Sequence, residues 1–573
     1  MKENISRRNF LTGMAATGAL ATIGLAGCSP SNQSSKATAD EADANTSASN
    51  QQTGADWLGS SPEITDIAET KTTDLLIIGA GNGGLGAAAV AADLGADFMI
   101  CEKSDSIQRS RHWFGAVNTS YTKEAGVSVN KSQLLNEFSR YASNLCDQKV
   151  IRVWIDESSD LVDWIDPILT EAGMSCSFDA DAAHETGGTS YYIPALEHYY
   201  HGEDASGEPL DRNNVLLDFI SEKGYDVSYK HEMVQLEREA GGRVTAAIFD
   251  TPDGYVKIEA TKGVLLTTGG YAGNATMVKE LNPIIPRCTT LNYNSPNCTG
   301  DGIKAAMLIG AQKDQNGAPM IFDRGAVKPG ENAGYTSDEP TAMFVGAGKQ
   351  FNLGSQPFMK VTRDGKRFVN ESTPYDFCCF AAAEHDGGVW CQIFDSKLKE
   401  DVDRFQTIGC SRQTQNLLAQ EDDTPIDEIY AEQLEAGTMF KADTIEELAD
   451  LLGFDGEAKD AFLAEVDRYN EFYDKQEDED FGKEAYRLSE LRNPPFYGGW
   501  FGGSLLTTVD GLRINEDMQV LDTDNKVIDG LYASGDCSGS IFGNNYPEYI
   551  VGCACGRTLT FSRHAVRHIM GDI

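Results

Sequence analysis

The sequence has few basic residues for its length. Lys and Arg number 47 against 88 Asp and Glu, which gives the 573-residue chain a formal net charge of −41 at pH 7. Because binding to nucleic acid phosphates requires clustered Lys and Arg, this balance excludes nucleic acid as the main partner. It also disfavours a small anionic ligand unless basic residues gather locally around it. After the N-terminus, no apolar run approaches the roughly 20 residues that a transmembrane helix needs.

The 13 cysteines show no spacing that is typical of haem or metal binding. The sequence contains no C-x-x-C-H segment for covalent haem attachment and no C-x-x-C pair. The close pairs are Cys378 with Cys379 and Cys553 with Cys555. We interpret the cysteines as small buried apolar residues and predict no metal site. An iron–sulfur site assembled from scattered cysteines stays open as an alternative, with no spacing that supports it.

The N-terminus carries a processing signal. The segment SRRNFL at 6–11 has the arginine pair of a twin-arginine export signal, and a mildly apolar stretch follows at 11–27. That stretch ends in LAGC, which reads as a lipobox with Cys28 as the acylated residue; the alternative is an ordinary signal peptide with a chance cysteine. We therefore predict that residues 1–28 are a signal and that Cys28 anchors the protein to the outer face of the cytoplasmic membrane. Residues 29–71 are polar and poor in large apolar side chains, so they are predicted to be a disordered linker.

A nucleotide-binding pattern follows the linker. The apolar run 74–78 is typical of a buried parallel strand, and it leads into the glycine-rich segment GAGNGG at 79–84. An Ala-rich helix at 85–94 and a second apolar strand at 98–101 come next, and the acid Glu102 ends that strand. In such a unit the glycines allow a tight turn, close approach to a pyrophosphate and close helix packing, while the acid binds ribose hydroxyls. The predicted cofactor-binding residues of this segment are Gly79, Gly81, Asn82, Gly84, Glu102 and Lys103.

Three later segments favour FAD over NAD by resemblance. GVLLTTGGY at 263–271, TGDG at 299–302 and GLYASGD at 530–536 resemble, in this order, the segments of the fumarate reductase and succinate dehydrogenase flavoproteins, a family that includes the 3-ketosteroid dehydrogenases. Asp536 stands where that family usually has Glu. The resemblance covers about residues 72–570 and implies non-covalently bound FAD. It adds the predicted cofactor-binding residues Gly269, Gly270, Asp301, Gly535 and Asp536.

The resemblance also implies the architecture. The expected fold class is α/β, with a Rossmann-like FAD-binding domain and an inserted α+β capping domain. The FAD-binding domain would comprise residues 72–312 and 507–573, and the capping or substrate domain residues 313–506. The active site would lie between the cap and the flavin, as ligand sites between domains commonly do.

The residues that bind dicarboxylates in fumarate reductases are replaced here. Those enzymes hold two carboxylates with two arginines and two histidines. After the segment GKRFVNE at 365–371, which is similar to the family's, Tyr375 stands in place of the proton-delivering arginine. In the tail, Phe542 replaces a histidine and Tyr546 an arginine. Two further histidines of the family align with Thr507 and Ala318.

The 3-ketosteroid dehydrogenases resemble this chain at both tyrosines, through Pro374-Tyr375 and Tyr546-Pro547. That resemblance implies that Tyr375 moves the proton on the α-carbon and that Tyr546 hydrogen-bonds the carbonyl that polarises the C–C bond. Arg367 and Glu548 complete the candidate catalytic set. Arg367 is either a cation near Tyr375 or a structural clamp of the cap, and Glu548 either lines the pocket or faces water. The segment 547–552 lacks the glycine-rich loop of the steroid enzymes, so a steroid substrate does not follow.

We therefore predict an exported FAD-dependent reductase that saturates an activated C=C bond in a small neutral acceptor, such as an enone or an unsaturated lactone. Electrons would come from a separate cytochrome or quinol-linked donor, because the sequence has no haem motif of its own. Exported reductases of this layout include the cardiac glycoside reductases. The alternatives are an oxidative 3-ketosteroid-type dehydrogenase, a fumarate-type dicarboxylate reductase and a non-enzymatic flavin- or ligand-binding lipoprotein.

Overall fold

The computed structural model describes residues 57–111, 113–180, 192–346, 349–407, 409–421 and 423–573. The export motif, the lipobox with Cys28 and residues 29–56 of the expected linker lie outside these ranges. The remainder of the expected linker is partly a strand, since β1 begins at Ile67 and pairs with β9 from there onward. Its polar side chains are suited to an exposed strand end, which is why composition suggested a linker.

The first sheet has eight strands and contains the nucleotide-binding unit. Strands β17, β9, β1, β2 and β6 are parallel neighbours, whereas β16, β8 and β7 pair antiparallel at the margins. Parallel strands covered on both faces are expected to be apolar, and the last four residues of β1 are buried. The strands are β1 (Ile67–Ile78), β2 (Phe98–Cys101), β6 (Val227–Ser228), β7 (Glu232–Arg238), β8 (Val244–Thr251), β9 (Gly254–Leu266), β16 (Gln519–Leu521) and β17 (Val527–Ala533).

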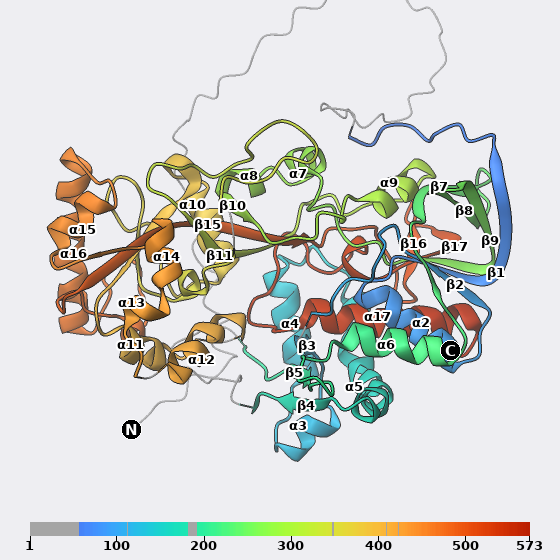
Figure 1. The fold of residues 1–573 in the computed structure, drawn as a ribbon, viewed down its shortest axis with the longest axis horizontal. Helices are drawn as coiled ribbons and strands as arrows, with labels where there is room; N and C mark the ends of the chain where they lie inside the picture. The colour runs from blue at the N-terminus through green and yellow to red at the C-terminus, as the bar shows by residue number, and fades with distance from the viewer. Residues whose placement is uncertain (1–56, 112, 181–191, 347–348, 408, 422) are drawn as a thin grey trace, which may run out of the picture. The chain divides into compact units, whose positions relative to one another are not determined.

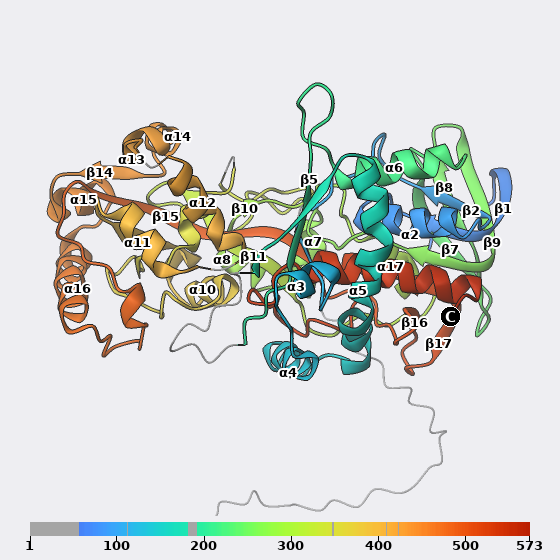
Figure 2. The ribbon, with the colours of Figure 1, turned by 90° about the horizontal axis from the view of Figure 1, so that it is seen from below.

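Two helices from opposite ends of the chain pack side by side against this sheet (Figures 1 and 2). They are α2 (Asn82–Asp93) and the C-terminal α17 (Cys553–Met570). Their close contact depends on small residues: a Cβ at Gly86 would lie 3.0 Å from Leu559 Cδ2. The C-terminal segment is thereby brought to the nucleotide-binding turn.

The second sheet has six strands arranged around the long strand β15. β15 pairs directly with β10, β11, β13 and β14, and β12 pairs with β13. Figure 1 shows β15 extending from the side of α15 and α16 toward the first sheet. The expected domain boundaries at 312–313 and 506–507 stay a prediction. The strands are β10 (Thr289–Asn292), β11 (Pro319–Val327), β12 (Met359–Val361), β13 (Trp390–Phe394), β14 (Phe440–Ala442) and β15 (Phe496–Thr508).

The remaining elements surround these sheets. A three-stranded sheet consists of β3 (Trp113–Gly115), β5 (Glu197–His201) and β4 (Ser175–Phe178). The helices that accompany it and the first sheet are α3 (Ser120–Glu124), α4 (Lys131–Tyr141), α5 (Gln148–Glu171), α6 (Arg212–Glu222) and α9 (Asp301–Leu308). Helix α7 (Ala275–Leu281) is followed by α8 (Ile285–Cys288), which packs against β10 and β15 of the second sheet. Around the second sheet lie α10 (Tyr375–Ala382), α11 (Leu398–Phe405), α12 (Arg412–Gln420), α13 (Ile426–Ile429), α14 (Ala431–Ala436), α15 (Ile445–Leu451) and α16 (Gly456–Lys475). Short 3-10 turns are η2 (Asn352–Ser355), η3 (Asp386–Gly388), η4 (Gly409–Ser411), η5 (Ala485–Arg487) and η6 (Gly535–Cys537). No helix in the described ranges combines the length and the apolar character that crossing a bilayer requires.

Candidate active site

The glycine-rich turn between β1 and α2 has the geometry of a dinucleotide cradle. Gly79 has a φ of +105°, and a Cβ at Gly84 would lie 1.7 Å from the Gly79 carbonyl oxygen. A Cβ at Gly81, by contrast, would meet no atom within 4 Å, because this residue faces open space. Gly81 is also the N-cap of α2 and makes no side-chain capping bond there, so the helix N-terminus is available to a phosphate group.

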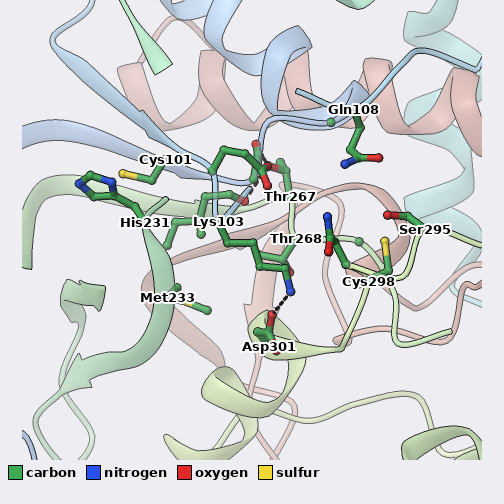
Figure 3. Close-up of a pocket in the computed structure, with 16 residues that line it drawn as sticks. Cys101, Lys103, Gln108, His231, Met233, Thr267, Thr268, Ser295, Cys298 and Asp301 are labelled. Atoms are coloured by element: carbon green, nitrogen blue, oxygen red, sulfur yellow. Dashed lines mark hydrogen bonds and ion pairs between the residues drawn. The ribbon is translucent and has the colours of Figure 1, made fainter. Parts of the chain in front are cut away.

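Glu102 and Lys103 are held at the end of β2, beside this turn. The Ala80 N–H donates to Glu102 Oε2 at 2.8 Å, and the Ser104 N–H donates to Glu102 Oε1 at 2.9 Å. Lys103 Nζ donates to Asp301 Oδ2 at 2.7 Å, at the start of α9, and Figure 3 shows this pair beside the cavity. The nucleotide-binding segment that ends in Lys103 and the TGDG segment that contains Asp301 therefore meet in space.

Three cavities form a continuous series beside the turn. The first, of about 120 Å³, is lined by Gly79, Gly81, Glu102, Lys103, Gly269 and Asp301 among others (Figure 3). The second, of about 430 Å³, shares Gly81 and Gly269 with the first and adds Asn82, Gly535 and Asp536. The third, of about 520 Å³, shares Met320, Leu506 and Cys555 with the second. An extended molecule can therefore lie along the first two cavities with one end facing the third.

These residues fit FAD. The turn is open at Gly81, which leaves room for a pyrophosphate, and Thr268 and Gly269 line the first cavity beside it. Arg557 fixes the tail segment, because its Nη1 donates to the Gly535 carbonyl at 2.7 Å and its Nη2 to Asp536 Oδ1 at 3.2 Å. Sequence reasoning did not identify Arg557, whose buried position on α17 gave no local signal.

Two predicted glycines act through packing. Gly84 and Gly270 line none of the described cavities. A Cβ at Gly270 would lie 2.4 Å from the Thr508 carbonyl oxygen, so this glycine permits close contact with the end of β15. Both residues shape the site without contacting the space that a cofactor would fill.

The third cavity, termed here the substrate cavity, brings together three of the four predicted catalytic residues. Tyr375, Tyr546 and Glu548 all line it, although they come from widely separated parts of the chain. Most of the other lining side chains are aromatic, apolar or polar and uncharged. The described lining residues are Arg111, Trp113, Tyr199, Tyr293, Met320, Phe322, Arg324, Gln350, Tyr375, Gln413, Asn416, Leu506, Tyr546, Glu548, Val551, Gly552, Ala554 and Cys555.

Tyr375 is fixed at the first position of α10, directly after Pro374. The first N–H groups of a helix have no partner within the helix, and here Glu548 Oε2 accepts the Tyr375 N–H at 2.8 Å. The ring packs edge-on against Phe322 with a centroid distance of 4.7 Å, and only 4% of the residue is exposed. Glu548 therefore positions the backbone that carries the candidate proton donor.

Tyr546 lies in the tail loop before α17. Its ring is 5.5 Å from that of Phe542, the residue aligned with a substrate histidine of fumarate reductases. Burial raises the pKa of the nearby Cys553 thiol to about 12, and a hydrogen bond from the Tyr546 side chain opposes this shift. The hydroxyl of Tyr546 therefore has a protein partner close to the cavity.

Glu548 holds its proton at neutral pH. Burial raises the pKa of its carboxyl to about 8, and the Asp323 carboxylate nearby adds to the increase. The Tyr375 N–H and the Arg324 guanidinium act in the opposite direction. The Ser411 hydroxyl lies 3.2 Å from Glu548 Oε1 and provides a second hydrogen-bond contact.

The structure places Arg367, the fourth predicted catalytic residue, outside the substrate cavity. Its guanidinium donates to both oxygens of Glu371 at 2.7 and 2.8 Å and to both oxygens of Asp478 at 3.1 and 2.8 Å. All three side chains are fully buried, and Lys483 Nζ lies 3.4 Å from Glu371. Arg367 therefore joins Glu371 to Asp478 outside the substrate cavity.

Sequence reasoning missed two cations that line the substrate cavity. Arg324 is on β11 and Arg111 precedes β3; Arg111 lines the second cavity as well. The available signal was the pair Asp323-Arg324 inside an otherwise apolar strand. Of the other aligned positions, Thr507 lines the second cavity, and the Ala318 N–H donates to Asp510 Oδ1 at 3.0 Å.

No metal centre is evident in the described part of the chain, where no group of three or more His, Cys, Asp or Glu side chains is placed to hold an ion. The cysteines whose side chains the structure describes are free thiols. Cys28 and Cys410 are not among them. The scattered cysteines that were considered for an iron–sulfur site are therefore not gathered in the described residues.

The chain belongs to the FAD binding domain family, whose sequence profile matches residues 74–548. A twin-arginine translocation signal matches residues 4–24. Together with the relatives and solved structures given below, the match confirms the expected FAD cofactor, the fold class with its Rossmann-like FAD-binding domain and cap, and an FAD-dependent oxidoreductase. The protein is an exported FAD-dependent oxidoreductase.

Its relatives include both reductases and a dehydrogenase. The chain is 26% identical over 516 residues to vinyl phenol reductase of Lactiplantibacillus plantarum, covering 88% of this chain and 97% of that protein. It is 24% identical over 533 residues to a fumarate reductase (cytochrome) of Shewanella frigidimarina, covering 89% and 78%. It is 29% identical over 400 residues to 3-oxosteroid 1-dehydrogenase of Mycobacterium tuberculosis, covering 64% and 61%.

Solved structures show the same fold. The 3-ketosteroid delta1-dehydrogenase of Sterolibacterium denitrificans superimposes with a TM-score of 0.67 at 20% identity, covering 88% of this chain and all of that one. A flavocytochrome c3 fumarate reductase in its open conformation gives 0.63 at 22% identity, covering 88% and 79%.

Proposed function

We propose that this oxidoreductase saturates an activated C=C bond in an organic acceptor that is not a dicarboxylate. The observation that carries the proposal is the meeting of Tyr375, Tyr546 and Glu548 on one cavity that adjoins the predicted flavin cavity. Relatives named vinyl phenol reductase and 3-oxosteroid 1-dehydrogenase support an acceptor other than a diacid. The direction of reduction is favoured because an exported flavoprotein of this family can receive electrons from a separate donor.

Each residue has a distinct role in this reaction. FAD, when bound, supplies the hydride for the β-carbon of the acceptor. Tyr546 donates a hydrogen bond to the acceptor carbonyl oxygen, where negative charge develops as the double bond is attacked. Tyr375 gives the proton that completes the α-carbon. Glu548 holds the N–H of Tyr375 and keeps a proton of its own at the cavity wall.

The size and lining of the substrate cavity support a ring-sized acceptor. A cavity of about 520 Å³ falls within the range of roughly 300–1,000 Å³ that is usual for small-molecule sites. The aromatic and apolar side chains on its wall, including Trp113, Phe322 and Leu506, suit an apolar body. Enones, unsaturated lactones and phenylpropenoid-like molecules fit this description.

A dicarboxylate reductase is the second candidate, and a specific observation favours it. Arg111 and Arg324 line the substrate cavity, and arginines bind carboxylates well. Neither occupies a position aligned with the arginines of fumarate reductases, where Tyr375 and Tyr546 stand instead. For this reason we place it second.

The proposal extends to the partners and the location. We infer that a separate membrane cytochrome or a quinol-linked subunit reduces the flavin, and that a lipid at Cys28 keeps the exported protein beside that donor. Twin-arginine export carries folded proteins, so FAD would be bound before the protein leaves the cytoplasm.

Variants of the two tyrosines test the proposed roles. The full-length, FAD-loaded protein is reduced anaerobically with a viologen dye, and dye reoxidation by enones and unsaturated lactones is followed. Tyr375→Phe and Tyr546→Phe should each lower kcat by about a hundredfold or more. Tyr430→Phe is the matched control, because Tyr430 is buried in the cap and lines none of the described cavities. Wild-type turnover by both active-site variants would refute the assignment.

A further inference from the structure

Arg324 is a buried cation, and one nitrogen of its guanidinium makes no hydrogen bond in the described residues. It is 1% exposed on β11 and lines the substrate cavity. Its Nε donates to Ser355 Oγ at 2.6 Å and its Nη1 to Asn352 Oδ1 at 3.3 Å. Its Nη2 is buried and has no hydrogen-bond partner in the described residues. Leaving a charged donor buried without an acceptor is costly, so such a group beside a cavity indicates a missing ligand atom.

In the described residues, no carboxylate is hydrogen-bonded directly to the Arg324 guanidinium. Both hydrogen-bond partners of the guanidinium are neutral groups, and its plane lies over the Phe322 ring at 4.9 Å. Arg367 in the same region of the chain shows the opposite arrangement, because two buried carboxylates surround it. The neighbouring Asp323 carboxylate interacts electrostatically with Arg324, but the Ser355 hydroxyl bridges the two groups, and the Lys360 ammonium has the larger effect on the pKa of Asp323.

The lining of the substrate cavity holds more basic groups than carboxyls. Among its described lining residues Glu548 is the sole carboxyl, and burial keeps the proton on that group. Arg111 also lines the cavity, and its guanidinium lies over the Tyr293 ring at 5.6 Å. The lining therefore carries two guanidinium groups and one carboxyl, although the chain has a net charge of −41. Such local focusing of positive charge is what an anionic ligand of an acidic protein requires.

We propose that Arg324 binds a carboxylate of the acceptor, which makes the substrate an unsaturated monocarboxylic acid with an apolar, ring-sized body. This inference rests on the proposed function and replaces the neutral acceptor expected from the sequence. Arg324 provides an ion pair strengthened by hydrogen bonds, while Phe322, Tyr293 and Leu506 contact the apolar body. The aromatic wall and the absence of the fumarate reductase arginines favour one carboxylate over two.

A matched pair of acceptors tests the role of Arg324. 3-Phenylacrylate and its methyl ester have the same body and double bond but differ in charge. With full-length, FAD-loaded enzyme reduced by viologen, the acid should have the lower KM. Arg324→Gln should raise the KM of the acid by roughly tenfold or more and leave that of the ester within about twofold, because a charge-assisted hydrogen bond is lost only with the acid. Arg324→Lys should retain part of the preference for the acid.

Binding of the saturated product analogue gives a readout that does not depend on turnover. Calorimetry should show tighter binding of 3-phenylpropanoate than of 3-phenylpropanamide, and Arg324→Gln should abolish that difference. Bound flavin absorbance and the melting temperature establish that the variant is folded; if it is not, the comparison is made with Arg324→Lys and with Arg111→Gln. An unchanged preference for the acid in the folded Arg324 variant would overturn the proposal. If no acid, ester, enone or lactone reoxidises the reduced wild-type enzyme, the proposed function itself fails. If esters and enones react but the acid has no lower KM than its ester, only the inference about Arg324 fails.

Discussion

Replacing Glu548 with Gln should separate the contribution of this carboxyl to stability from its contribution to turnover. The side-chain amide of Gln can still accept the Tyr375 N–H that Glu548 accepts at 2.8 Å. It cannot titrate. The substitution therefore keeps the start of α10 in place and removes a single proton-binding group from the wall of the substrate cavity.

The sign and size of the effect on stability follow from the shift in pKa. Burial raises the pKa of Glu548 from 4.5 to about 8. Between these values the folded protein retains a proton that the unfolded chain releases, so this group makes the free energy of unfolding fall as pH rises. Its contribution is complete below pH 4.5 and is lost as pH rises through about 8. One proton corresponds to about 1.4 kcal/mol per pH unit, and Glu548→Gln should flatten the dependence by that amount.

Glu197→Gln is the matched control. Burial also raises the pKa of Glu197 to about 8, but this residue on β5 lines none of the described cavities. Urea unfolding at several pH values between about 5 and 8 should show the same flattening for both variants. The pH profile of kcat with viologen as donor should change only for Glu548→Gln. A wild-type pH dependence of stability in Glu548→Gln, or the same kcat profile for both variants, would refute the reasoning.

Two other substitutions test the cradle and the cap. Gly84→Ala should abolish FAD retention, measured by the flavin absorbance of purified protein, because its Cβ would lie 1.7 Å from the Gly79 carbonyl oxygen; full flavin content would show that the turn tolerates a side chain. Arg367→Gln should lower the free energy of unfolding by about 3–5 kcal/mol, since it leaves Glu371 and Asp478 buried without their main counter-ion. Its kcat per bound flavin should stay near the wild-type value, and a large loss of kcat with normal stability would restore a catalytic role to Arg367.

The nucleotide-binding part of the fold could be predicted because its determinants are local. Gly79 adopts a positive φ, and Gly84 has no room for a Cβ; both requirements act within one turn and therefore leave a motif in the sequence. The start of β1 could not be predicted in the same way. Residues 69–73 are polar, and they belong to a strand because β9 lies beside them, which is a contact between segments far apart in the chain.

The substrate cavity shows the same distinction. Tyr375 and Tyr546 were identified through resemblance and Glu548 as their neighbour in the tail, and all three line one cavity. Arg324 was missed because its importance comes from what surrounds it: Ser355 and Asn352 hold the guanidinium, and neither is a carboxylate. Of the two carboxylates that bind Arg367, only one lies close to it in the sequence. Glu371 lies four residues away, whereas Asp478 is 111 residues away along the chain.

Reoxidation of the reduced flavin by different acceptors tests the central claim most directly. Full-length, FAD-loaded protein is reduced anaerobically, mixed with one acceptor at a time, and followed at the flavin absorbance band. The panel comprises fumarate, 3-phenylacrylate, its methyl ester, a cyclic enone and an unsaturated lactone. The account predicts rapid reoxidation by at least one ring-bearing acceptor with a single carbonyl or carboxylate, and slow reoxidation by fumarate. Rapid reoxidation by fumarate with no response to the other acceptors would contradict it and would establish a dicarboxylate reductase.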